Sequence, residues 1–178
     1  MATYNTYVSI PHASYVEWRY FTLGNSYDVD GVPAYQPYQC WDFASEFWWN
    51  VGFPTNYPIT GGDNARGIWT NREQNKGDVF DLITDINSLQ VGDVICFSVD
   101  PYGHVGFLDE TYDGGGYFKL LSQNVLDQDY VTAQNYPVDS FQGAFRYKGW
   151  HNIPPTPSET KKNKFPWVLY ARKLRNNY

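Results

Sequence analysis

The sequence has little of what would assign it to a compartment or to a membrane. It holds only two cysteines, Cys40 and Cys96, so at most one disulfide can form and the redox compartment stays open. No apolar run approaches the length of a membrane span. The opening segment MATYNTYVSI lacks the basic start and the apolar stretch of a signal peptide. We therefore expect a soluble protein, either intracellular or released by a route that the chain does not encode.

Positive charge is also scarce over most of the chain. Residues 1–152 carry 18 acidic and 7 basic side chains, whereas residues 153–178 carry one acidic and six basic ones. An acidic globular part would repel phosphates, which excludes a nucleic-acid partner. The same charge suits a cation such as calcium, or a basic or neutral substrate. The basic end is either a contact for an anionic polymer or a solvated linker.

Aromatic residues, in contrast, are abundant and make up 19% of the chain. One interpretation is a β-rich core with an amphipathic surface. The other is that some rings line a groove and stack on a sugar or a peptide. The length of 178 residues fits one domain with a short extension.

The predicted elements run from helices to strands. A short helix is expected at 13–23, and a helix of about three turns begins at Cys40, with a further short helix in 61–72. Alternating, β-branched segments then predict strands, of which the first two form a hairpin: 92–99, 104–112, 116–125 and 141–150. This order predicts an α+β fold, with N-terminal helices packed on an antiparallel meander.

The C-terminal part has a different composition. Residues 151–164 are rich in Pro, Thr and Lys without an apolar period, which is typical of a linker. Residues 165–178 are apolar and then basic. They form either the start of a further domain or a docking segment.

Cys40 is the strongest candidate for chemistry. A thiolate at the start of a helix is stabilised by the free N–H groups and the helix dipole. A nucleophilic cysteine also needs a base and a group that orients the base. His104 lies in an apolar strand context, and the polar residues 122–124 interrupt the next strand, where burial requires partners for them. The alternative is that Cys40 is a small buried apolar residue, an interpretation that fits Cys96 well.

Three segments together resemble a known family. YQCWDFASEFWW, LQVGDVICFSVDPYGHVGFL and LLSQN, in this order, are similar to the signature blocks of the cysteine, histidine-dependent amidohydrolase/peptidase (CHAP) domains. The related NlpC/P60 hydrolases usually have DCSGF around the cysteine. The resemblance covers about residues 13–150 and implies a papain-like fold, in which helices pack on an antiparallel sheet.

The resemblance also implies roles for individual residues. Cys40 is similar to the nucleophile, His104 to the general base and Asn124 to an asparagine that the family often has. Ser122 departs from the family, which often has Glu there, and this leaves the orientation of His104 to Asn124, a carbonyl or water. The oxyanion would be held by the Cys40 N–H, with Gln39 as a candidate second donor.

Three aspartates bracket the cysteine: Asp28, Asp30 and Asp42. Carboxylates placed close together repel one another unless a cation joins them, and calcium prefers such oxygen ligands, including loop carbonyls. The spacing is not that of an EF-hand. Some CHAP domains hold calcium with a similar arrangement, so we expect a calcium site here. The alternative is a plain Asx-rich turn, with Asp42 favoured by the helix dipole.

The resemblance implies a function as well. We expect residues 1–150 to form a monomeric CHAP domain that cuts an amide bond of bacterial peptidoglycan, as an endopeptidase or an N-acetylmuramoyl-L-alanine amidase. Such domains belong to bacteriophage lysins or bacterial cell-wall hydrolases. We expect a phage endolysin or a virion-associated lysin, made in the host cytoplasm and then released or carried in the virion. The alternative is a catalytically inactive wall-binding or phage tail module on the same fold, which the Ser122 departure and the aromatic richness would explain.

Overall fold

The computed structural model describes residues 12–30, 38–61, 64–99, 101–125 and 129–151. The predicted linker after His151 and the basic C-terminal segment lie outside this part of the chain. Within it the helices are α1 (Tyr15–Thr22), α2 (Cys40–Asn50), α3 (Arg66–Thr70), α4 (Arg72–Lys76) and α5 (Lys148–His151), with a 3-10 turn η1 (Ile86–Ser88). The strands are β1 (Phe80–Ile83), β2 (Val94–Phe97), β3 (His104–Leu108), β4 (Tyr117–Ser122), β5 (Thr132–Pro137) and β6 (Phe141–Tyr147).

The strands form one antiparallel sheet in the order β1-β6-β2-β3-β4-β5. The α+β class and the β2–β3 hairpin are therefore as predicted. The prediction of a simple meander is wrong for the last strand, because β6 returns to lie between β1 and β2. The centre of β6 is buried on both faces at Gly143, Ala144 and Phe145, which suits an interior position rather than an edge.

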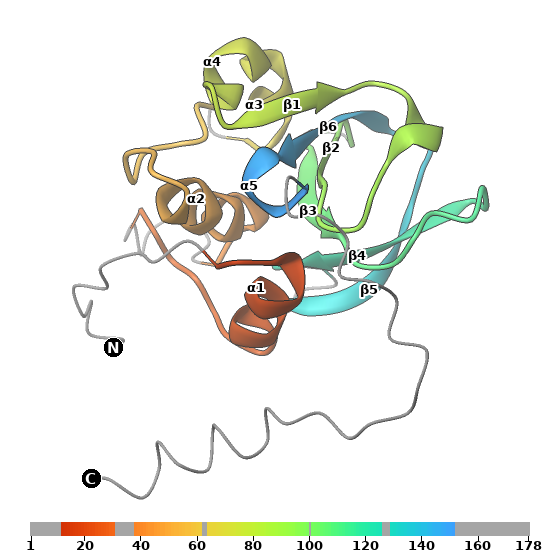
Figure 1. Ribbon diagram of the computed structural model, residues 1–178, viewed down its shortest axis with the longest axis horizontal. Helices are drawn as coiled ribbons and strands as arrows, with labels where there is room; N and C mark the ends of the chain where they lie inside the picture. Colours follow the sequence, from red (N-terminus) through yellow and green to blue (C-terminus); the bar gives the residue numbers. More distant parts are fainter. Residues whose placement is uncertain (1–11, 31–37, 62–63, 100, 126–128, 152–178) are drawn as a thin grey trace, which may run out of the picture.

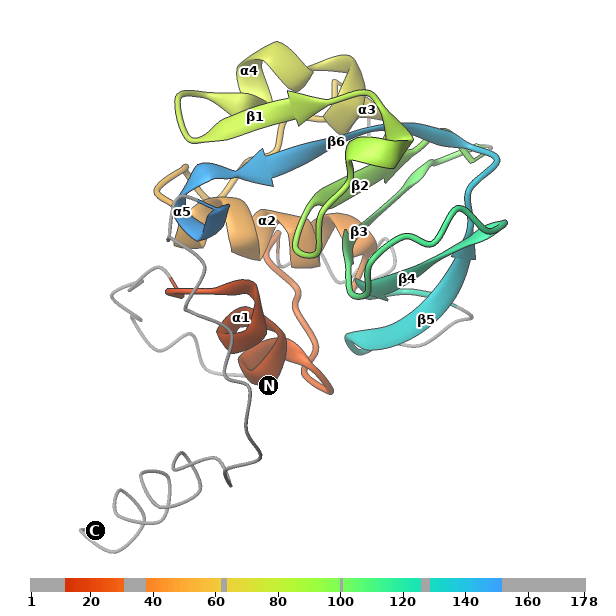
Figure 2. The same ribbon diagram turned by 45° about the vertical axis from the view of Figure 1, so that its right-hand side comes forward.

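The helices lie mainly on one side of the sheet. Figures 1 and 2 both show α1 and α2 beside the curved sheet, with α3 and α4 near its β1 edge. Aromatic rings from α1 and α2 fill the space between the layers. Trp18 of α1 stacks on Phe43 of α2 at 5.6 Å between ring centroids, and Phe43 contacts Phe107 of β3 at 5.1 Å. Much of the aromatic content is thus core, as the first interpretation of the composition held.

Both faces of the central strands are buried. Along β2, Val94 and Cys96 belong to the core on the helical side, while Ile95 and Phe97 belong to a second apolar cluster on the other face. Side chains alternate between the two faces of a strand, so a strand covered on both sides reads as continuously apolar. None of the described helices is long and apolar enough to cross a membrane.

Local signals explain where the helices begin. Ser14 caps α1, and its side-chain oxygen accepts a hydrogen bond from the Glu17 N–H at 3.2 Å. Gln39 precedes α2 in an extended conformation, and its N–H donates to the Asp42 carboxylate at 2.7 Å. That carboxylate replaces the intrahelical partner that a first-turn N–H group lacks. As a result, α2 begins at Cys40 and ends at Asn50, as predicted.

Candidate active site and acidic cluster

Cys40 is the first residue of α2 and its side chain is buried. Its thiol contacts the backbone N–H of Val105 in β3. This N–H and those of Trp41 and Cys40 itself favour the thiolate and lower the pKa of Cys40. Burial outweighs these donors and raises the pKa of Cys40 to about 11. The stabilisation expected at a helix start is therefore present but insufficient. At neutral pH Cys40 is a thiol, and it needs a base to become a nucleophile.

His104 is the first residue of β3 and is 6% exposed. Burial lowers the pKa of His104 to about 4, so the imidazole is neutral at neutral pH and can accept a proton. The ring stacks on Tyr136 of β5, with centroids 4.6 Å apart and planes 14° apart. A neutral imidazole and a neutral thiol suit general-base catalysis, rather than a preformed ion pair.

The polar residues 122–124 are all paired, as their burial requires. The Ser122 hydroxyl lies 2.8 Å from His104 Nε2. The Gln123 side chain accepts from the Tyr27 N–H at 2.8 Å and donates to the Tyr27 and Gln39 carbonyls at 2.7 and 3.1 Å. Gln123 thereby ties the end of β4 to the segment that precedes α2. Sequence reasoning did not single out Gln123 as a support of this segment.

Among the described residues, Asn124, one of three groups considered for orienting His104, contacts Gln39. Its side-chain amide donates to Gln39 Oε1 at 3.1 Å, whereas the residue at His104 is Ser122. Ser122, which departs from the family pattern, is thus the residue of this segment that contacts the His104 ring. Asn124 instead holds the acceptor end of the Gln39 amide, and this directs the donor end of that amide away from Asn124. The structure therefore links both predicted residues, Gln39 and Asn124, to each other at the start of α2.

Cys40 and His104 are connected through shared neighbours, Val105 and Tyr136. In the part of the chain that is described, no hydrogen bond joins Cys40 Sγ to the His104 ring. The thiol contacts the N–H of Val105, the residue after His104. Cys40 also contributes to the raised pKa of the Tyr136 phenol, which lies against the His104 ring. Catalytic hydrogen bonds are often long before substrate binds.

Tyr136 is a site residue that the sequence analysis missed. It stacks on His104 and contacts Phe97 at a tilt of 51°, with ring centroids 4.6 Å apart in each case. Burial raises the pKa of its phenol to about 12, with a further contribution from Cys40. Tyr136 lies on β5, a strand that the sequence analysis did not predict. Its partner across the strands is Phe118, and such aromatic cross-strand pairs are the signal that could have revealed it.

Cys96 has the structural role that was expected of it. It is fully buried in the middle of β2, and burial raises the pKa of its thiol. Both cysteines are free thiols. Cys96 therefore contributes to the apolar core on the helical side of the sheet.

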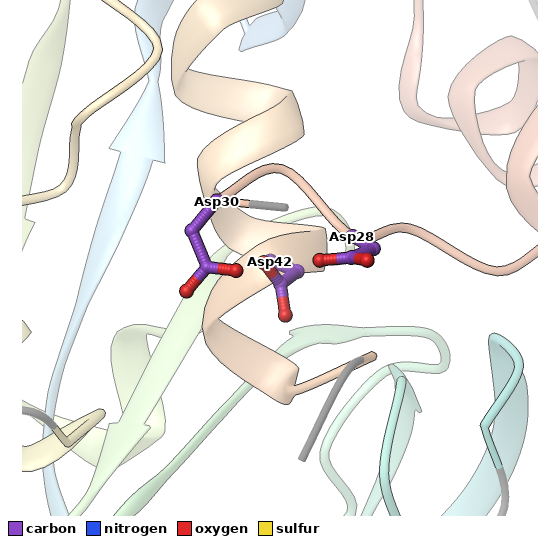
Figure 3. A group of neighbouring side chains, drawn as sticks. All are labelled: Asp28, Asp30 and Asp42. Atoms are coloured by element: carbon purple, nitrogen blue, oxygen red, sulfur yellow. The ribbon is translucent and has the colours of Figure 1, made fainter. Parts of the chain in front are cut away.

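The three aspartates do gather in space. One carboxylate oxygen from each of Asp28, Asp30 and Asp42 lies within 4.8 Å of the others, and Asp42 lies between the other two in Figure 3. Asp42 is buried, Asp28 is half-buried and Asp30 is exposed. Such a set of hard oxygen donors fits a divalent cation. Residues 31–37, which include the expected carbonyl ligands, lie outside the described part.

The acidic cluster brings three carboxylates close together. Burial, together with the charges of Asp30 and Asp28, raises the pKa of Asp42 to about 6, against the opposing effect of the N–H groups of Gln39 and Val29. These two N–H groups donate to Asp42 at 2.7 and 3.0 Å. These hydrogen bonds occupy part of the acceptor capacity of the Asp42 carboxylate, but an N–H group carries no full positive charge. A bound cation would supply that charge and would favour the ionised form of Asp42.

A cysteine at a helix start, a histidine on a facing strand and a buried polar group on that histidine form the arrangement of thiol hydrolases. The chain belongs to the CHAP domain family, whose model matches residues 27–124. The three sequence blocks and the fold agree with this assignment.

Known proteins are similar along most of the chain. A D-alanyl-L-alanine endopeptidase from Streptococcus phage B30 is 31% identical over 163 residues, which cover 88% of this chain. The chain spans about a third of that relative, 35% of its length. The crystal structure of the wild-type endolysin LysIME-EF1 shares the fold, with a TM-score of 0.56 and 17% identity, covering 92% of this chain and 84% of that one.

Proposed function

We propose that this chain hydrolyses an amide bond of bacterial peptidoglycan through a Cys40 thiol and a His104 base. The observation that carries the proposal is the buried, neutral pair at the start of α2 and β3, with a polar partner on the histidine. A wall-binding module would have no use for this arrangement. The family, and the endopeptidase name of the phage relative, support the same conclusion.

The proposed reaction follows from the charges at the site. The imidazole of His104 takes the proton of the Cys40 thiol as the sulfur attacks the amide carbonyl. The new imidazolium then gives its proton to the leaving amine, and a thioester to Cys40 remains. Water, activated by His104, then attacks the thioester. The carboxylic acid product is released and the Cys40 thiol is regenerated.

The oxyanion formed on attack needs donors at the start of α2. The Cys40 N–H is one of the N–H groups that a helix leaves without an intrahelical partner. The Gln39 side chain is the proposed second donor, since Asn124 holds the acceptor end of its amide. Asn124 thus acts in this proposal through Gln39, rather than through His104.

Calcium is the proposed cation of the acidic cluster. Asp28, Asp30 and Asp42 would hold it, and its charge would offset their mutual repulsion. Because Asp42 and Cys40 share the first turn of α2, the ion would brace the turn that carries the nucleophile. The contribution is structural, and the chemistry is carried out by Cys40 and His104.

For the bond that is cut, we propose the one between D-alanine and L-alanine, in line with the name of the phage relative. For the source, we propose a phage lysin that is released or carried in the virion. Residues 1–150 are the proposed catalytic domain, and the basic segment after the linker is the proposed wall contact. A monomer suffices, since one chain holds every proposed site residue.

The test uses purified peptidoglycan whose cross-bridges begin with L-alanine. We expect the full chain to release soluble fragments with new L-alanine amino groups, identified by mass spectrometry, and Cys40→Ala and His104→Ala to release none. His12→Ala is the matched control, because the His12 ring contacts Trp18 and Phe21 of α1, and it should keep its activity. Fragments that carry intact stem peptides would instead identify an amidase. No fragments from the wild type would refute hydrolysis altogether.

A further inference from the structure

We propose that Ser122 is a positioning residue that fixes the proton of the neutral His104 ring on Nε2 and leaves Nδ1 as the base. This inference rests on the proposed function for its catalytic consequence. The tautomer itself is a property of the folded chain and can be measured without substrate.

The partners of the Ser122 hydroxyl determine which way its proton points. Its oxygen lies 2.8 Å from the Val105 carbonyl, 3.3 Å from the Gln123 carbonyl and 2.8 Å from His104 Nε2. A hydroxyl has one proton to donate, and a carbonyl oxygen can only accept. The shorter carbonyl contact therefore takes the Ser122 proton. The remaining contact, with His104, is then a hydrogen bond only if Nε2 carries the proton and donates.

Burial makes the alternative tautomer unfavourable. Ser122 has no exposed surface and His104 is 6% exposed, so water does not readily replace a lost partner. With the proton on Nδ1, the Ser122 hydroxyl would have to turn to Nε2, and the Val105 carbonyl would lose its donor. An unsatisfied buried acceptor of this kind is costly. The hydroxyl thus orients the ring as an asparagine or carboxylate can, but without adding a negative charge.

The peptide units around Val105 connect this hydroxyl to the nucleophile. The Val105 carbonyl accepts from Ser122, while the Val105 N–H lies at the Cys40 thiol. The same residue therefore fixes both the group that orients the base and the sulfur that the base must deprotonate. Nδ1, the nitrogen that Ser122 does not use, is left as the proton acceptor for Cys40.

Gly106 provides the room for this serine. The pairing of Phe107 with Leu121 places Gly106 opposite Ser122, on the same face of β3 as His104. A Cβ atom at Gly106 would lie 2.9 Å from the Ser122 Cβ and 3.2 Å from its Oγ. Gly106→Ala should therefore displace the Ser122 hydroxyl without changing residue 122 itself, and it provides a second, independent way to remove the contact.

The test is 15N NMR of the full chain with labelled histidine, at neutral pH. The sequence has three histidines, and His104→Gln assigns the His104 signals by their loss. We expect the wild type to show the Nε2–H tautomer of His104. Ser122→Ala and Gly106→Ala should shift His104 toward a mixture of tautomers. Ser45→Ala, the matched control, removes a buried hydroxyl that bonds the Thr55 carbonyl and should leave the His104 spectrum unchanged.

The rate of wall hydrolysis tests the consequence. A wrongly protonated histidine should lower kcat about ten- to a hundredfold in Ser122→Ala, with little change in KM. An Nδ1–H tautomer in the wild type would overturn the proposal, as would a Ser122→Ala protein with an unchanged spectrum and an unchanged rate. If the wild type shows the Nε2–H form but cuts no peptidoglycan, the proposed function fails while the role of Ser122 in fixing the tautomer stands. If Ser122→Ala does not fold, the wild-type and Gly106→Ala spectra decide.

Discussion

The first turn of α2 carries two sites, the neutral site around Cys40 and the acidic site around Asp42, which differ in their electrostatic surroundings. Cys40 and its surroundings are neutral, buried and satisfied by partners within the chain, through Val105, His104, Ser122 and Tyr136. Asp42, two residues later, is equally buried but lies beside two further carboxylates. One site is paired within the protein, and the other gathers three carboxylates. The comparison accords with the proposal that the fold provides the chemistry, while a cation would stabilise the turn that holds it.

The largest expected effect is on the neutral site. Cys40→Ala should lower the rate of peptidoglycan hydrolysis by about 10³-fold or more, because no second nucleophile replaces the sulfur. Cys96→Ala is the matched change, since it removes the other buried thiol of the chain. It should keep its activity within a few-fold and lose about 1 kcal/mol of stability from the small cavity. Activity in Cys40→Ala, with loss in Cys96→Ala, would reverse the assignment of the nucleophile.

The next effect concerns the acidic site. Calcium at about a thousandfold excess over its Kd should add about 4 kcal/mol to the free energy of unfolding. For a domain of this size, that is a rise in Tm of roughly ten degrees. Asp30→Asn should abolish the rise, because exposed Asp30 supplies one of the three carboxylates.

Asp78→Asn is the control for this measurement. Asp78 is also exposed and lies next to β1, outside the cluster, so its replacement should leave the calcium effect intact. Thermal melts in calcium, in magnesium and in a chelator would make the comparison. Identical melts of the wild type in all three would leave the aspartates as turn residues and refute the cation site.

The pH dependence of stability should separate the two sites. The pKa of His104 is lowered by burial from 6.5 to about 4, so the unfolded chain binds this proton more readily. His104 therefore contributes stability above pH 6.5, and this contribution is lost as the pH falls toward 4. The shift corresponds to about 3 kcal/mol. Without a cation, the contribution of Asp42 to stability has the opposite pH dependence. Its pKa is raised to about 6 in the folded protein, so its ionisation lowers the free energy of unfolding as the pH rises through that value.

Denaturant unfolding of wild type and His104→Gln between pH 4 and 7, both in saturating calcium, would measure the His104 contribution. Calcium keeps Asp42 ionised, so the difference between the two curves reports on His104. We expect the wild type to lose more stability than the variant as the pH falls. Parallel curves would contradict a buried, neutral His104.

The smallest effect concerns the support of the base. Tyr136→Leu removes the ring that stacks on His104, and the loosened imidazole should lower kcat about tenfold. Tyr136→Phe keeps the stacked ring and should stay within about twofold of the wild type. Steady-state rates on soluble wall fragments would distinguish the two. Equal losses in both variants would show that the phenol, rather than the stacking, is what matters.

The sequence predicted the elements that have strong local signals. The Cys40 helix has a run without Gly or Pro, and the β2–β3 hairpin has a turn between two β-branched, apolar segments. In contrast, β1 and β5 are the two edges of the sheet. The residues of β5 are mostly half-buried or exposed and include polar side chains, so no clear alternation marks the strand. Tyr136 was missed for this reason.

The sequence predicted the cysteine and the histidine of the site, but not which residues contact them. Spacing placed a cysteine at a helix start and a histidine on a strand, but it could not tell which of three consecutive polar residues reaches the ring. That depends on the pairing of β3 with β4 and on the room at Gly106. The effect of burial on the Cys40 pKa was likewise invisible, because it depends on the packing of α2 against β3.

The most direct test of the account is partial alkylation of the full chain with iodoacetamide, followed by peptide mass mapping and by assay of the same samples on peptidoglycan. The account predicts that hydrolysis is lost in proportion to the label on Cys40, and that His104→Ala slows the labelling, since the base that generates the thiolate is gone. Cys96, with no exposed surface, should stay unlabelled while the protein is folded. Full labelling of Cys40 with hydrolysis intact, or loss that follows a label on Cys96, would contradict the claim that Cys40 is the nucleophile.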